Sequence, residues 1–410
     1  MLSITSKIRH LTEQADRPVI FARQNLQDLN SSTASSSELP VTAIVIPYTF
    51  LPPKNGGHQA GYGLCEALGR KVPTVCISNF DNEAGDYTFQ LERAFGEGMT
   101  KYFSPAAAWR CYRILKKSRA KYCIAQQPFI VPLLLPLLAI LGVQLFVYAH
   151  NIEYRRFRSM GKWWWRIVWL VEYVVYRLAA QVLFISSEER MAAIAEFGLD
   201  AKRCTDVPYG VDRKKPPTTA ERTTARQELA EKHGFSASEH WVLFFGPQNY
   251  QPNLEAVLFI AQKLAPLLQE QLQMPYRILI CGGALPAEYE KLEAYRQYKL
   301  NYLGFVEDIE RYVLAADVVL NPIVKGAGVK TKVLEAIALD RTVISSKSGA
   351  FGIHAAVCGD KLRIVADDDE VALAKAIIEN SEQQDAVTPA AFYNYYYRDA
   401  VVKALLPKLQ

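Results

Sequence analysis

The sequence predicts an α/β protein with two doubly wound domains, each built on a parallel sheet with helices on both faces. Short, almost wholly apolar strands alternate with helices along most of the chain, and this alternation is interrupted once, near residues 208–220. A strand that is apolar along its whole length is buried on both faces, which is typical of parallel sheets. With 410 residues, the chain is too long for one ordinary core and suits two domains of roughly 150–200 residues each.

The first forty residues precede this pattern. Residues 1–40 are expected to form a helical or loose lead that ends in a Ser-rich linker, Ser31–Ser37. The segment Met1–Ile20 carries charges throughout and has no apolar core, so it does not resemble a secretory signal.

The first domain is predicted over residues 41–207. Its strands are expected at Val41–Ile46, Thr74–Ile77, Tyr122–Ala125, Gln144–Ala149, Val182–Ile185 and Cys204–Val207, with intervening helices such as Gly61–Leu68, Ala106–Arg119 and Trp163–Ala179.

One apolar stretch in this domain, Phe129–Ala149, is long enough on paper to span a bilayer. Two prolines, Gly142 and Gln144 divide it into a shorter helix and a strand. A buried helix over about 130–140 that leads into a parallel strand gives the same composition, and we favour that interpretation.

Three prolines, Gly210 and a run of charges in Pro208–Pro217 interrupt the alternation and predict an interdomain linker over 208–220. The second domain is predicted over 221–389, followed by a C-terminal helix within 390–410. Strands are expected at Trp241–Phe245, Ile278–Cys281, Asn301–Leu303, Val318–Asn321 and Thr342–Ser345, with helices such as Asn253–Glu270, Thr331–Leu339 and Ala390–Leu406.

Composition narrows the class of protein. A formal net charge of +5 is a mild excess that suits an anionic ligand or a membrane surface, whereas a nucleic-acid binder would carry a denser basic stripe. The seven cysteines lie far apart, and none forms a CxxC pair. We therefore expect a cytoplasmic protein with neither a disulfide framework nor a metal site.

Ligands of parallel α/β sheets bind beyond the carboxyl ends of the strands, so the loops there are the candidate sites. The first such loop is Pro52–His58, where Gly56 and Gly57 precede a helix. Paired glycines let a phosphate approach backbone N–H groups at the positive end of the helix. A flexible turn is the alternative, because the loop has neither the P-loop pattern nor GxGxxG.

The second loop, Tyr148–Tyr154, follows an apolar strand and contains His150. A histidine there could bind a sugar hydroxyl or stabilise developing charge, and the adjacent Asn151 and Glu153 favour that role. A purely structural hydrogen bond is the alternative.

The third loop, Asn321–Ala336, joins a strand to a helix. Gly326 and Gly328 allow close approach of a ligand, and Lys330 can reach a phosphate. Glu335 lies one to two turns inside the helix, where a carboxylate can accept ribose hydroxyls. Its alternative role is a plain acid that stabilises the helix dipole.

Further blocks accompany these loops in a fixed order. They are Pro53 with Gly56–Gly57, His150–Tyr154, Ile185–Glu188, Val207–Asp212, Phe245–Asn253, Gly304–Asp308, Gly326–Leu339 and Thr342–Ile353. Over roughly 41–410 this set resembles the GT-B glycosyltransferases of family 4, and the loop resembles the GxGxK subgroup. The resemblance implies two Rossmann-like domains facing across a cleft, with the C-terminus crossing back to the first.

The resemblance also implies roles for individual residues. Glu335 corresponds to the second acid of a paired-glutamate motif that holds the donor ribose, His150 would contact the transferred sugar, and Lys330 would stabilise the leaving diphosphate. The remaining donor contacts would come from Gly56, Gly57, Gly304, Phe305, Val306, Gly326, Ala327, Gly328, Val329 and Thr331.

Two features depart from the family pattern. Ala327 stands where the first acid of the paired motif is expected. Many relatives carry a basic pair after the strand corresponding to Trp241–Phe245, but Pro247, Gln248 and Asn253 occupy those places here. Lys330 could supply the missing charge.

The expected reaction is transfer of a sugar from a nucleoside-diphosphate sugar, with retention of configuration and without a metal, in cell-surface polysaccharide or glycolipid synthesis. The acceptor would be a saccharide or a lipid-linked saccharide. The acceptor or membrane side is assigned to Glu153, Arg155, Arg156, Trp163 and Trp164, because basic and aromatic residues mixed on a helix suit a membrane interface. A helix that buries its tryptophans and displays its charges is the alternative.

Three other functions compete with this one. Ala327 and the missing basic pair also suit a GT-B protein that binds without transferring. A GT-B epimerase needs acid/base carboxylates in the cleft, which Ala327 argues against. A dehydrogenase is disfavoured because no strand is followed by GxGxxG.

Overall fold

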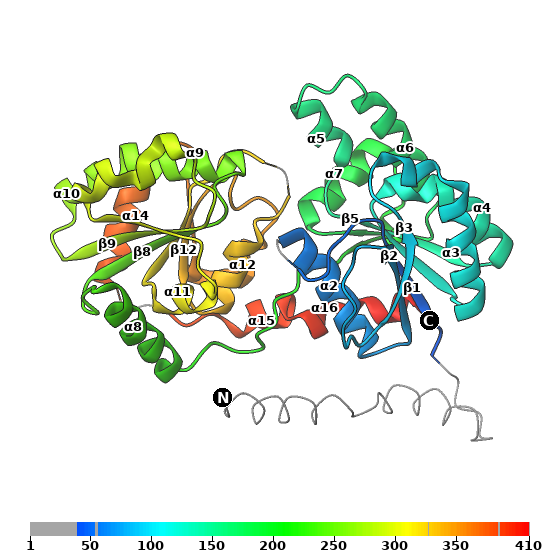
Figure 1. Cartoon of the computed structure of the whole chain (residues 1–410), viewed down its shortest axis with the longest axis horizontal. Coiled ribbons are helices and arrows are strands. Elements are labelled where there is room, and N and C mark those ends of the chain that lie inside the picture. Colours follow the sequence, from blue (N-terminus) through cyan, green and yellow to red (C-terminus); the bar gives the residue numbers. More distant parts are fainter. Residues whose placement is uncertain (1–38, 54–55, 327, 384–385, 410) are drawn as a thin grey trace, which may run out of the picture. The chain divides into compact units, whose positions relative to one another are not determined.

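The structure is a computed structural model that describes residues 39–53, 56–326, 328–383 and 386–409. The predicted lead and Ser-rich linker, up to residue 38, lie outside the described residues. From Pro40 onward the chain forms one compact unit, which contains two parallel sheets (Figure 1).

The first sheet has the strand order β3-β2-β1-β4-β5-β6-β7, and all of its neighbouring strands pair in parallel. The strands are β1 (Thr42–Ile46), β2 (Thr74–Asn79), β3 (Gln90–Phe95), β4 (Tyr122–Gln126), β5 (Gln144–Ala149), β6 (Gln181–Phe184) and β7 (Cys204–Asp206).

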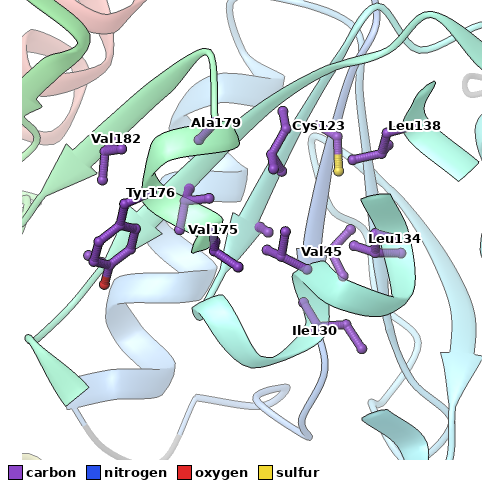
Figure 2. Close-up of a cluster of buried hydrophobic side chains, with 14 of the residues drawn as sticks. Val45, Cys123, Ile130, Leu134, Leu138, Val175, Tyr176, Ala179 and Val182 are labelled. Atoms are coloured by element: carbon purple, nitrogen blue, oxygen red, sulfur yellow. The ribbon is translucent and has the colours of Figure 1, made fainter. Parts of the chain in front are cut away.

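Both faces of this sheet are buried, as an apolar parallel strand requires. Alternate residues of β1 enter different cores: Val45 belongs to one hydrophobic cluster and Ile44 to another. Figure 2 shows the first cluster, in which Val45 lies near Leu134 and Val175. The helices packed there are α3 (Pro105–Ser118), α4 (Val131–Leu141), α6 (Trp165–Leu178) and α7 (Ser187–Phe197), whereas α2 (Gly56–Gly69) covers the other face.

The apolar stretch 129–149 is a helix followed by a strand, as we predicted. Helix α4 ends at Leu141, Gly142 caps it in the left-handed conformation, and β5 begins at Gln144. In the part of the chain that the structure describes, no helix combines the length and apolarity needed to cross a membrane.

The second sheet has the order β10-β9-β8-β11-β12-β13 and is also parallel throughout. Its strands are β8 (His240–Phe245), β9 (Tyr276–Cys281), β10 (Leu300–Gly304), β11 (Val318–Asn321), β12 (Thr342–Ser346) and β13 (Leu362–Val365). Its helices include α8 (Thr219–His233), α9 (Gln251–Phe259), α10 (Ala265–Gln271), α11 (Ile309–Ala315), α12 (Thr331–Ala338), α13 (Ala355–Cys358) and α14 (Glu370–Glu382). The prediction of two doubly wound α/β domains is confirmed.

The sequence pattern missed two of the four edge strands, β3 and β13. Residues of β3 are exposed or half-buried until Ala94, and β13 has only one fully buried residue, Leu362. An edge strand borders solvent, so it lacks the continuous apolar run on which the prediction depended.

The single C-terminal helix predicted at Ala390–Leu406 is wrong, because the structure has two helices there. Helix α15 (Ala390–Tyr396) and helix α16 (Arg398–Leu405) are separated by Tyr397, which is extended. The break is caused by pairing with the linker: Val211 N–H donates to Tyr396 O, and Arg398 N–H donates to Val211 O. As a result α15 packs into the core of the second domain and α16 into that of the first.

Arg398 stabilises the segment in which the chain returns to the first domain. Its side chain is buried, donates to Gly210 O at 2.9 Å and pairs with Asp212. It also lies flat against helix α2, because a Cβ placed on Gly63 would fall 1.4 Å from Arg398 Nη1. Glycine at position 63 is therefore needed to admit the guanidinium between α2 and the linker.

We predict that Gly63→Ala lowers the free energy of unfolding by about 1–3 kcal/mol, the usual cost of overpacking, even though alanine favours a helix more than glycine does. Chemical denaturation measures the change. Gly96→Ala is the matched control, since a Cβ there meets nothing within 4 Å. Equal stability of the two variants would contradict the packing role of Gly63.

Candidate functional site

Two helix N-termini lie against each other at the carboxyl edges of the two sheets. Helix α2 begins at Gly56 and α12 begins at Thr331. A Cβ on Gly56 would lie only 2.6 Å from Thr331 Oγ1, so the two first turns are in direct contact. The paired glycines were predicted to precede their helix, but Gly56 and Gly57 are its first two residues. Their N–H groups thus belong to the turn that carries the positive end of the helix dipole.

The glycine loop before α12 meets the loop after β5. Gly326 and Gly328 have φ angles of 91° and 79°, which favour glycine over residues with a Cβ. Gly328 also lies so close to Asn151 that a Cβ would be 2.7 Å from Asn151 Oδ1. Lys330 folds over this loop and donates from Nζ to Gly326 O and Gly328 O at 2.8 and 2.9 Å. Burial lowers the pKa of Lys330 to about 8.

Glu335 is half-buried one turn inside α12 and accepts a hydrogen bond from the interdomain linker. Tyr209 donates its hydroxyl to Glu335 Oε1 at 2.8 Å. Burial raises the pKa of Glu335, and the hydrogen bonds from Tyr209 and Thr331 act in the opposite direction. The alternative role, an acid that stabilises the helix dipole, stays open. Tyr209 stood in a recognised sequence block, but its contact with Glu335 spans 126 positions and has no local signal.

Three strands of the second sheet end in loops that are bound to one another. Gly246 N–H donates to Cys281 O, Gln248 N–H to Gly283 O, and Gly282 N–H to Gly304 O. Three of the predicted donor contacts lie here: Gly304 uses its carbonyl in this network, Phe305 is 78% exposed, and Val306 packs partly into the core. Gly304–Val306 lies at the end of β10, which is three strand spacings from β11, or roughly 14 Å at the usual interval.

His150 follows β5 and faces the end of β4. Its Nε2 lies 3.3 Å from Gln126 Oε1, an acceptor to which the tautomer protonated on Nε2 would donate. Burial lowers the pKa of His150 to about 4, which keeps the ring neutral near pH 7. Gln126 Nε2 is buried without a hydrogen-bond partner among the described residues, so this corner holds a donor beside a neutral imidazole.

Comparisons with known proteins agree with this architecture. Residues 55–215 match the model of "Glycosyltransferase Family 4", and residues 239–383 match that of "Glycosyl transferases group 1". The two models together cover about three quarters of the chain. The chain belongs to the family 4 glycosyltransferases of GT-B fold. This assignment favours glycosyl transfer over the epimerase and dehydrogenase alternatives.

Several solved structures are similar to this chain over most of its length. Sucrose-phosphate synthase from Thermosynechococcus elongatus is 16% identical, with a TM-score of 0.67 over 90% of this chain and 99% of that one. HepE from Anabaena, in complex with UDP, is 15% identical with a TM-score of 0.66 over 90% and 99%. WaaG, a glycosyltransferase involved in lipopolysaccharide biosynthesis, is 15% identical with a TM-score of 0.59 over 88% and 95%. No curated protein sequence matches the chain.

Several expectations from the sequence concern the donor loop, metal binding and the cysteines. Ala327, the departure from the paired-acid motif, lies outside the described residues, and the GxGxK subgroup stays a prediction. Within the described ranges no group of three or more His, Cys, Asp or Glu side chains could hold a metal ion, and metal independence stays a prediction. All seven cysteines are free and buried.

The residues assigned to the acceptor or membrane side divide into two groups. Glu153 is buried at the start of α5 (Glu153–Ser159), where Arg156 Nε donates to its Oε2 at 2.8 Å, and Arg155 pairs with Glu196. Trp163 is 80% exposed, whereas Trp164 is partly buried against the core of the first sheet. The structure thus brings Glu153 near Asn151 and the donor loops, and it places Trp163 on the outer surface.

A buried carboxylate that sequence reasoning missed positions α5. Glu172 on α6 accepts the N–H groups of Glu153 and Tyr154 at 2.8 and 2.9 Å and the Tyr176 hydroxyl at 3.0 Å. It therefore caps the first turn of α5 from a neighbouring helix. Burial raises the pKa of Glu172 to about 7, although its three donors favour the carboxylate form.

This raised pKa predicts a pH-dependent stability. Between about pH 4.5 and 7 the native carboxyl keeps a proton that the unfolded chain has released, so stability falls as pH rises through this window. We expect Glu172→Gln to remove up to about 3 kcal/mol of that fall, measured by urea unfolding from pH 5 to 8. Glu231→Gln, an exposed carboxyl on α8, is the control. A Glu172→Gln curve parallel to that of the parent protein would show that Glu172 does not titrate in this range.

Proposed function

We propose that this glycosyltransferase transfers a sugar from a nucleoside-diphosphate sugar to a saccharide or lipid-linked saccharide, with retention of configuration. The observation that carries the proposal is the contact between the N-termini of α2 and α12, with Lys330 and half-buried Glu335 beside it. Two helix N-termini and an ammonium group form an anion site suited to a diphosphate. HepE, a structural relative, has been solved with UDP and with UDP-glucose.

The positions of the donor's ribose and base follow from this diphosphate site. Glu335 would accept the ribose hydroxyls, since a half-buried carboxylate that accepts from Tyr209 on one oxygen can accept further hydrogen bonds. The base would lie at Gly304–Val306, and the roughly 14 Å between the loops after β10 and β11 suits an extended nucleotide. The site's contribution would be positioning of the donor and stabilisation of the leaving diphosphate.

His150 and Gln126 would contact the transferred sugar. A neutral imidazole and an unpartnered buried amide can exchange hydrogen bonds with sugar hydroxyls, whereas a histidine with a pKa of about 4 would not act as a general acid near neutral pH. Retention would then arise from attack on the donor's own face, assisted by the leaving phosphate. Metal and cofactor are not required by this scheme.

The first test is a thermal-shift screen with UDP-glucose, GDP-mannose, ADP-glucose and the free nucleoside diphosphates. A ligand at a hundred times its Kd stabilises the native state by about 2.7 kcal/mol, which raises the melting temperature by several degrees. We expect Glu335→Ala to lose this shift and Glu379→Ala, a half-exposed surface acid on α14, to keep it. The absence of a shift with every nucleotide would overturn the donor assignment, and binding without turnover would identify a non-catalytic protein.

We also propose that the first domain contacts the cytoplasmic face of an anionic membrane, in the synthesis of a surface polysaccharide or glycolipid. Helix α6 and the residue before its N-cap carry an exposed apolar stripe at helical spacing. The stripe consists of Trp163 (80% exposed), Ile167 (57%), Leu170 (55%), Val174 (41%) and Leu178 (58%). The exposed Arg166 and Arg177 lie on the same side of the helix.

The charged residues in the segment that contains α6 are almost all basic. Residues 98–186 contain thirteen Lys and Arg but only two acids, Glu153 and Glu172, and both acids are buried. An exposed apolar stripe flanked by cations matches an interfacial helix, which inserts side chains while its cations meet lipid headgroups. Anionic lipid is favoured over a protein partner by this charge complementarity.

Vesicle co-sedimentation tests the membrane contact. We expect binding to phosphatidylglycerol-containing vesicles, weaker binding at high salt, and little binding to pure phosphatidylcholine. The double variant Ile167→Asn, Leu170→Asn should bind roughly tenfold more weakly. Val371→Asn, an exposed apolar residue of α14 in the second domain, is the control. Equal binding to both vesicle types, or a dimer that the double variant dissociates, would contradict the proposal.

A further inference from the structure

Lys332, which sequence reasoning did not single out, places its ammonium group at the carboxyl end of β8. It is the second residue of α12, and its Nζ donates to Phe245 O at 3.0 Å and Asn253 Oδ1 at 3.3 Å. The same nitrogen lies 4.1 Å from the centroid of the Phe244 ring. Asn253 in turn donates to Pro247 O at 2.9 Å. One lysine therefore connects the first turn of α12 to the last residue of β8 and the first turn of α9, on either side of the loop between them.

The Lys332 ammonium group has few negative charges near it. Both of its acceptors are neutral, and β8 and α9 face it with a ring, a carbonyl and an amide. The charged groups that act on it are on or beside its own helix: Lys330 repels its charge and Glu335 favours it. Burial, followed by repulsion from Lys330, lowers the pKa of Lys332 to about 7. A buried cation in such a setting gains most from an anion brought by a ligand.

The neighbouring helix terminus independently suits an anion. Lys330 is the N-cap residue of α12, and Lys332 lies in its first turn. The positive end of the α12 dipole would therefore act on the same ligand as the two lysines. Two ammonium groups and one helix terminus suit the two negative charges of a diphosphate diester better than the single charge of a carboxylate.

We propose that Lys332 is a second cationic positioning residue of the donor site, which holds the loop after β8 and becomes charged when a diphosphate binds at the N-terminus of α12. This inference rests on the proposed function. It also accounts for the absence of basic side chains at Pro247, Gln248 and Asn253, because the positive charge reaches that loop from α12 instead.

Charging of Lys332 couples donor binding to proton uptake. A bound anion raises the pKa of a nearby ammonium group, so at pH 8 the complex binds protons that the free protein has partly released. Affinity should therefore fall as pH rises from about 7 to 9. Nucleoside-diphosphate sugars are suitable probes, because both of their phosphates are diesters that do not titrate in this range.

Isothermal titration calorimetry at pH 8, in two buffers with different ionisation enthalpies, measures the protons taken up per nucleotide bound. The probes are UDP-glucose, GDP-mannose and ADP-glucose. We expect proton uptake by the parent protein, and at least roughly tenfold weaker binding with reduced uptake by Lys332→Met. Lys332→Arg, which keeps a charge that does not titrate, should retain more affinity than Lys332→Met while losing the same part of the uptake. Lys375→Met, which removes an exposed lysine of α14 near Glu379, is the matched control and should match the parent protein.

The outcomes separate the two proposals. If none of the probes binds the parent protein, the proposed function is wrong, and this inference with it. If the parent protein binds a probe and Lys332→Met takes up as many protons, the assignment of Lys332 alone is overturned, even when binding is weaker, because a purely structural role would leave the uptake unchanged.

Discussion

Parallel pairing of every strand in both sheets is the constraint from which the site follows. When neighbouring strands run the same way, their carboxyl ends share one edge, and each strand must return through a crossover that covers a face. The loops after β1, β5 and β11 are therefore brought to the sheet edges without any local signal that joins them. The contacts of Gly56 with Thr331 and of Gly328 with Asn151 show how closely these loops meet.

The electrostatics of this edge depend on burial rather than on the number of charges. Lys330 and Lys332 have lowered pKa values, and Glu335 has a raised one, with desolvation as the first cause in each case. Side chains held in this way are already dehydrated and oriented by hydrogen bonds to the backbone, Asn253 or Tyr209. A charged ligand then meets groups that need little reorganisation, which is the arrangement that electrostatic stabilisation of a leaving group requires.

The sequence predicted those parts of the structure whose signal is local. Strand β5 and the glycines of the loop before α12 could be recognised from apolar runs and spacing, and the order of the blocks indicated the family. Tertiary contacts determined the rest. Tyr397 interrupts a regular amphipathic pattern only because Val211 pairs beside it. Lys332 looks like any helix lysine until β8 is placed next to it, and Glu172 looks like an ordinary surface acid until α5 docks on it.

The net charge of the chain likewise hides a feature that becomes apparent only when the charges are placed along the fold. The formal charge of +5 describes a mildly basic protein, yet residues 98–186 alone hold thirteen basic residues and two buried acids, so the rest of the chain is net acidic. This separation has a physical consequence that the average conceals: in the field of an anionic surface, the first domain is attracted while the remainder is repelled. The chain would therefore approach such a surface in one orientation, with the exposed stripe of α6 toward the lipid. The basic residues of the segment 98–186 and the exposed apolar stripe of α6 would then contact the same surface.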